Sequence, residues 1–269
     1  ASLDLCDRHS LQVVLVTPLC PGRERSAQRL QEIQNLSDSV AQRLVAAGAQ
    51  NLQLENVCRP PHAVILEATE RFQPSMLVMS SLFGEDYDDL EHFTLGSTAD
   101  RVLGSSSEPI LLIEGDIPCP ERLWSDILIY AEEPVTNSVC LAATRALALK
   151  NARTHLFHVI EDLWLDQLHH AVELASEVPL AVTEEALVRS LRGRMTRYLE
   201  AAQGHLNATG HQASYEIVQG DPIDLTRQQI IQRKPGLLIC NSLAPDHKLI
   251  DSTAYNLAAY VREIPLLLC

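Results

Sequence analysis

A short polar segment, Gly96-Ser97-Thr98, has the residue types that hold a phosphate group. It lies between an apolar run that reads as a strand and a pattern that predicts a helix. Glycine lets the backbone come close to an anion, and the N–H groups of a helix start donate hydrogen bonds to it together with a hydroxyl. The same donors serve when a residue simply caps a helix, so the segment predicts either a cap or an anion site.

Other groups that could do chemistry are arranged less well for it. Five carboxylates between residues 85 and 91 could hold Ca²⁺ or Mg²⁺, but the loop lacks the glycine and spacing of an EF-hand, which favours a solvated loop. His169 and His170 are adjacent, so on a helix they point about 100° apart and do not chelate together. Asp246-His247 and the serines lack a G-x-S-x-G turn. We therefore predict no catalytic residue and no metal site.

The cysteines are scattered and form no CxxC pair, and several lie in apolar runs. We expect buried free thiols in a reducing cytosol rather than disulfides. The seven residues are Cys6, Cys20, Cys58, Cys119, Cys140, Cys240 and Cys269.

A cluster of arginines lies in the segment 186–206, which has a helical pattern: Arg189, Arg192, Arg194 and Arg197. Such a face is most often solvated and paired with carboxylates, and the chain has an excess of those. The alternative is that it seats an acidic partner.

Charge and composition exclude several classes of partner. The net charge is −14, so nucleic acids and anionic membranes are repelled. Hydrophobic residues make up 46% of the chain but aromatic residues only 4%, which suits helices packed on aliphatic strands. No apolar run reaches about 18 residues, so we expect a cytoplasmic protein without membrane insertion.

Strand and helix patterns alternate along the chain, and the order occurs twice. In the first copy, strands are expected at 11–17, 51–57, 75–80 and 108–113, with helices at about 23–47, 62–72 and 96–103. In the second copy, strands are expected at 126–130, 154–160, 213–218, 236–240 and 264–268, with helices at about 136–149, 183–208, 223–232 and 251–257. Ser97-Thr98-Ala99 matches Ser252-Thr253-Ala254. Alternation at this spacing predicts βαβ units and a parallel sheet.

The repeat predicts an α/β fold of two tandem domains, residues 1–117 and 122–269, each with a parallel sheet and helices on both faces. The first copy has no counterpart of the leading strand 126–130, so we expect that domain to be incomplete at its N-terminal end.

Several segments resemble the universal stress protein family, whose fold is of the adenine nucleotide alpha hydrolase-like type. The likeness is best at Met76–Ser81, Leu95–Leu103 and Pro109–Ile113, and Gly220-Asp221-Pro222 also looks like the family. It extends over nearly the whole chain as a tandem pair. The resemblance implies a five-stranded parallel sheet in each domain and a homodimer or an intramolecular domain pair.

Members of that family that bind ATP carry a loop of the form G-x2-G-x9-G-[ST]. Gly96-Ser97 matches its last pair, Ser80 stands at its first glycine, and Phe83 or, with a slip, Gly84 stands at its second. The resemblance therefore implies that ATP or AMP binds in the first domain against Ser80, Gly84, Gly96, Ser97 and Thr98.

The second domain departs further from the ATP-binding pattern. Cys240 and Leu243 stand at the first glycines and Asp251 replaces the glycine before Ser252, so we expect no ATP there. Glu132 keeps an acidic residue at the end of the leading strand.

These expectations favour a non-enzymatic regulatory protein of universal stress type. The alternative is a cytosolic regulatory domain of a larger membrane transporter without nucleotide binding, and a third hypothesis is a nucleotide hydrolase.

Overall fold

The computed structural model describes residues 12–18, 27–57, 59–80, 95–114, 117, 120–132, 137–162, 165–167, 170, 180–241 and 253–269. The chain divides into two compact units, residues 1–110 and 111–269. The sequence places the joint a few residues later, between 117 and 122.

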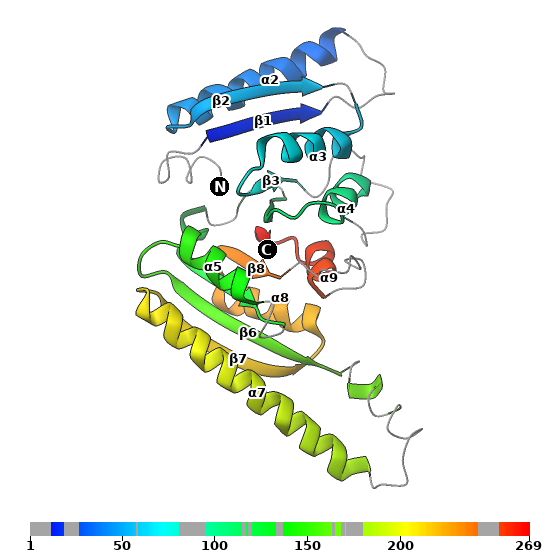
Figure 1. Ribbon diagram of the computed structural model, residues 1–269, viewed down its shortest axis with the longest axis vertical. Coiled ribbons are helices and arrows are strands. Elements are labelled where there is room, and N and C mark those ends of the chain that lie inside the picture. The colour runs from blue at the N-terminus through cyan, green and yellow to red at the C-terminus, as the bar shows by residue number, and fades with distance from the viewer. Residues whose placement is uncertain are drawn as a thin grey trace. The chain divides into compact units, whose positions relative to one another are not determined.

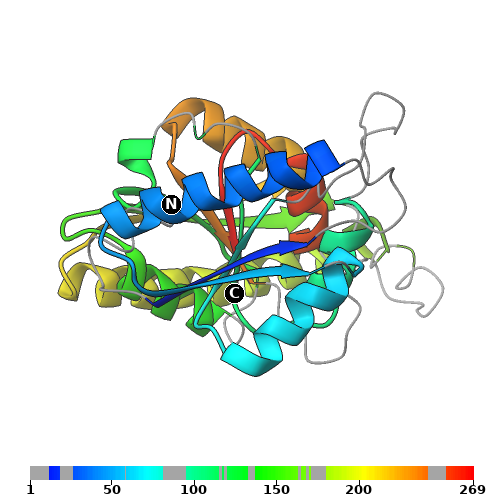
Figure 2. The same cartoon turned by 90° about the horizontal axis from the view of Figure 1, so that it is seen from above.

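The first unit alternates strands and helices, as labelled in Figure 1. Its elements are β1 (Gln12–Pro18), α2 (Ala27–Ala46), β2 (Gln50–Val57), α3 (Pro61–Phe72), β3 (Leu77–Met79) and α4 (Ser97–Leu103), followed by β4 (Ile110–Leu112), which runs across the boundary. β1 and β2 pair in parallel, with Leu15 opposite Leu54. Figure 2 shows α2 on one face of this pair and α3 on the other. The Leu77 N–H donates to the Pro109 carbonyl (2.8 Å), which joins the start of β3 to the residue before β4.

The second unit has the same order of elements with one more strand and helix at its start. After a short 3₁₀ turn, Pro120–Arg122, its elements are β5 (Asp126–Tyr130), α5 (Asn137–Leu147), β6 (Arg153–Glu161), α7 (Leu180–Ala208), β7 (Gln212–Gly220), α8 (Pro222–Arg233), β8 (Leu237–Cys240), α9 (Thr253–Tyr260) and β9 (Leu266–Leu268).

The sheet of the second unit is parallel throughout, in the order β9-β8-β5-β6-β7. Every residue of β5, β8 and β9 is buried, as expected of strands covered on both faces. Figure 2 shows α5 and α7 on one face and α8 and α9 on the other. The chain order changes direction between β5 and β8, and open α/β sheets bind ligands at the carboxyl ends of the strands at such a point.

Local signals explain where helices begin and end. Asp221 caps α8, because its carboxylate accepts hydrogen bonds from the N–H groups of Ile223 and Asp224 (both 2.9 Å), and Pro222 fills the first helical position. Gly210, with φ 94°, follows α7 in the left-handed conformation that ends many helices.

The α/β fold with parallel strands flanked by helices is confirmed. In the described part of the first unit no strand corresponds to β5, and β1 with β2 form a two-stranded sheet of their own. In the second unit β5 is the strand that joins β6 and β7 to β8. Without a described counterpart of β5, the equivalent strands β1 and β2 of the first unit pair only with each other.

Candidate functional site

The predicted anion segment of the first unit lies between β3 and α4. Ser80 follows β3 directly and is half-buried, while Gly96 is buried and comes immediately before α4. Gly84 and the acidic residues 85–91 lie outside the described residues, so the structure places three of the five predicted contacts at the start of α4 and one at the end of β3.

The backbone conformation at Gly96 favours glycine at this position. Its φ is 84° and its ψ 150°, a region that residues with a Cβ rarely enter. Its carbonyl accepts the first hydrogen bond of α4 from the Asp100 N–H (3.0 Å), so Gly96 occupies the N-cap position. The segment therefore caps α4 through Gly96 and not through Ser97, which is already inside the helix. Ser97 is exposed, whereas Thr98 is only 6% exposed and faces the core.

The corresponding place in the second unit is the start of α9, where a carboxylate of the same unit contacts the first residue of the helix. The Thr253 hydroxyl, on the first residue of α9, donates to Glu161 Oε1 at the end of β6 (2.9 Å). A carboxylate at a helix N-terminus satisfies the charge preference that a phosphate would otherwise meet. Residues 242–252, including Asp251 and Ser252, lie outside the described part.

Further carboxylates surround this end of the second sheet. Burial raises the pKa of the Tyr130 hydroxyl well above its usual range, and the nearby charges of Glu161, Glu132 and Asp221 raise it further. His158 Nδ1 donates to the Ala131 carbonyl (2.6 Å), and burial lowers the pKa of its ring despite this bond. The end of the sheet where a ligand would approach is therefore negatively charged, which opposes a nucleotide.

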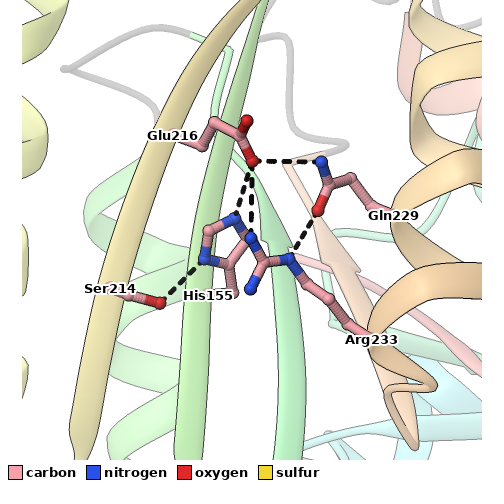
Figure 3. Close-up of polar contacts among 5 residues, drawn as sticks. All are labelled: His155, Ser214, Glu216, Gln229 and Arg233. Atoms are coloured by element: carbon pink, nitrogen blue, oxygen red, sulfur yellow. Dashed lines mark hydrogen bonds and ion pairs between the residues drawn. The ribbon is translucent and has the colours of Figure 1, made fainter.

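A polar cluster that the sequence did not reveal lies between β6, β7 and α8 (Figure 3). His155 Nδ1 contacts Ser214 Oγ (2.8 Å), and its Nε2 lies 3.7 Å from Glu216 Oε2. Gln229 donates to the same Glu216 oxygen (3.1 Å), and Arg233 both contacts that oxygen (3.4 Å) and donates to Gln229 Oε1 (2.5 Å).

The serine–histidine contact of this cluster is poorly suited to catalysis. Burial and, to a smaller extent, the charge of Arg233 lower the pKa of His155 to about 4, although Glu216 opposes both. A base with so low a pKa is weak at neutral pH. His155 is also the third residue of β6, near its amino end, whereas α/β sheets bind ligands at the carboxyl ends. The cluster joins α8 to the sheet.

Three cysteines gather in the second unit, all fully buried: Cys140, Cys240 and Cys269. The pKa of the Cys140 thiol is raised, first by a hydrogen bond with Cys269 and then by burial, and burial raises the pKa of Cys240. Thiols in this state react slowly, so the prediction of buried free thiols is confirmed for these three. The other four lie outside the described residues.

Two searches of the described residues were negative. No group of three or more histidine, cysteine or acidic side chains is placed to hold a metal ion within the described ranges. Of the helices that the structure describes, none combines the length and the apolar composition that crossing a bilayer demands.

Comparison with known proteins supports the fold and finds a family similarity in the first part of the chain. Residues 7–114 match the model of the universal stress protein family. No curated protein matches the sequence significantly. A universal stress protein from Archaeoglobus fulgidus aligns over 100% of this chain and 91% of its own, with 17% identity and a TM-score of 0.68.

Two other solved structures are less similar. The functionally unknown protein PA1789 from Pseudomonas aeruginosa aligns over 96% of this chain and 82% of its own, with 15% identity and a TM-score of 0.52. The cytoplasmic domain of a prokaryotic cation chloride cotransporter aligns over 98% and 87%, with 11% identity and a TM-score of 0.45, a value too low to bear on the transporter alternative. The match over residues 7–114 shows that this part of the chain is similar to the universal stress protein family.

Proposed function

We propose that this protein is a non-enzymatic regulatory protein of universal stress type, which binds ATP or AMP in its first unit. The family match over residues 7–114 supports the first part of the proposal. The conformation of Gly96 supports the second, because it lets the backbone crowd a phosphate at the start of α4.

The proposed contacts come from both sides of the loop between β3 and α4. Ser80 and Gly84 follow β3, and Gly96 and Ser97 precede or open α4. Thr98 contributes its backbone N–H, since its side chain is buried. The second unit takes no nucleotide, because Glu161 already holds the Thr253 hydroxyl and further carboxylates lie nearby.

The assembly and the location of the protein are part of the same proposal. The two units would act as an intramolecular domain pair or within a homodimer, in the cytoplasm and without nucleic acid. The arrangement of His155 gives no support to a hydrolase, because its low pKa leaves the serine beside it without an effective base.

Isothermal titration of the whole chain with ATP and with AMP tests the proposal. We expect one nucleotide per chain and a loss of at least about tenfold in affinity in Gly96→Val, because the branched side chain both strains the backbone and fills the space of a phosphate. Thr253→Val, a valine substitution at the start of α9 in the second unit, should bind like the wild type.

Two outcomes would contradict the proposal in different ways. If neither nucleotide produces heat on titration, the proposal that the chain binds ATP or AMP is wrong, and the proposal of a regulatory protein still stands. If the purified chain releases phosphate from ATP faster than Gly96→Val does, the proposal that the protein is not an enzyme is wrong.

A further inference from the structure

The helix α7 is longer than the sheet on which it packs. Its 29 residues span about 43 Å, whereas the nine residues of β6 and of β7 span about 30 Å. Among residue 186 and residues 188–208, for which burial is described, the buried side chains are Met195, Leu199, Ala202 and Leu206. Figure 1 shows the first turns of α7 extending past the ends of β6 and β7. The first part of α7 therefore extends beyond the sheet on which the helix packs.

Three arginines of this helix are exposed to solvent. Arg192, Arg194 and Arg197 are exposed and make no ion pair with any residue that the structure describes. In a chain of net charge −14, carboxylates are abundant, yet the structure does not bring one to these three. The sequence left open whether these arginines pair with carboxylates of the chain or bind an acidic partner. For these three residues the structure favours the acidic partner.

Gly193 stands in the middle of this arginine group. Residues four apart are neighbours on a helix surface, so Arg189 and Arg197 lie one turn before and one turn after it. A Cβ added at Gly193 would meet no atom within 4 Å, so no packing within the described part of the chain requires glycine there. Glycine weakens a helix interior, and it leaves room for a second backbone to approach closely.

We propose that the face of α7 formed by Gly193, Arg194 and Arg197 is a docking surface for an acidic polypeptide segment of a partner protein. The partner's carboxylates would pair with the arginine side chains, and its backbone would pass over Gly193. The guanidinium group suits this task, because it forms paired hydrogen bonds with carboxylates and remains charged at any physiological pH. The surface is separate from the proposed nucleotide site, so its test is independent of that proposal.

A direct test is fluorescence anisotropy with a labelled helical peptide of about 20 residues made of glutamate, alanine and leucine, at low salt and without nucleotide. We expect the wild type to bind and added salt to weaken the complex. The double variant R194E/R197E should lose at least about tenfold in affinity. The double variant R43E/K150E makes the same change in net charge at exposed residues elsewhere and should bind like the wild type.

A second pair of variants tests the close approach. Gly193→Leu should weaken the peptide complex, whereas Gly204→Leu, at the other glycine of α7 whose added Cβ would meet open space, should not. Circular dichroism checks that each variant keeps its helices.

The proposal is overturned if the wild type does not bind the peptide, if R43E/K150E loses as much affinity as R194E/R197E, or if the two glycine variants bind alike. A dimer of the wild type in analytical ultracentrifugation that R194E/R197E dissociates would show that a second copy of the chain is the occupant, and would also overturn it.

Discussion

At the scale of single residues, the two units differ in what stands at the start of their last helix. In the first unit the position is a glycine with φ 84°, a conformation that lets the backbone come close to a ligand. In the second unit the Glu161 carboxylate is already hydrogen-bonded to Thr253. The negative charge of this carboxylate at the start of α9 repels a second anion, so we expect the second unit not to bind a phosphate group.

His155 gives the second unit a specific dependence on pH. Its pKa is lowered from 6.5 to about 4 in the folded chain, chiefly by burial, so the unfolded chain takes up a proton first as the pH falls. The folded state therefore loses stability between pH 6.5 and 4, by up to about 1.4 kcal/mol per pH unit, and the contribution is constant above this window.

Urea unfolding of the wild type and of His155→Gln at pH 7 and pH 5 measures this effect. Glutamine can still hydrogen-bond Ser214 but takes up no proton. The wild type should lose more stability between the two pH values than the variant does. Equal losses in the two proteins would mean that His155 is not shifted in the folded chain.

At the scale of elements, most helices and strands could be predicted from the sequence, because apolar runs of strand length alternate with helical patterns. The predicted helix 183–208 is α7, which begins three residues earlier at Leu180, and the predicted strand 236–240 is β8. The predicted helix 223–232 is α8, which begins one residue earlier at Pro222, where a cap and a proline act as local signals.

The polar contacts could not be predicted in the same way. The His155–Ser214 contact depends on the register of β6 against β7, in which these two residues are direct partners. The Thr253–Glu161 bond joins residues 92 positions apart. Such pairs are set by sheet order and register, which a single sequence does not specify. The alternation of Ser214 and Glu216 along one strand was the one available sign that both side chains lie on the same face.

The cap of α8 provides a test at this scale. Asp221→Ala removes the acceptor of two backbone N–H groups, so the free energy of unfolding should fall by about 1 kcal/mol. Asp221→Asn, which keeps a cap, should recover most of the loss. Thermal unfolding of the three proteins gives the comparison, and an unchanged midpoint in Asp221→Ala would show that the cap does not contribute.

At the scale of the whole molecule, the shared order of elements in the two units supports the proposal that one βα module was duplicated. The order from β1 to β4 is repeated from β6 to β9, while β5 and α5 have no counterpart among the described residues of the first unit. After such a duplication the two copies are free to diverge in chemistry while the packing of strands and helices is kept. The central claim is that the first unit retained an open anion site and the second closed its own.

Hydrogen exchange of the whole chain, followed by mass spectrometry with and without ATP, tests this claim most directly. The account predicts that ATP slows exchange in peptides containing Ser80 and Gly96–Thr98 and leaves those containing Cys240 and Thr253 unchanged. Protection at the start of α9, or equal protection in both units, would contradict it.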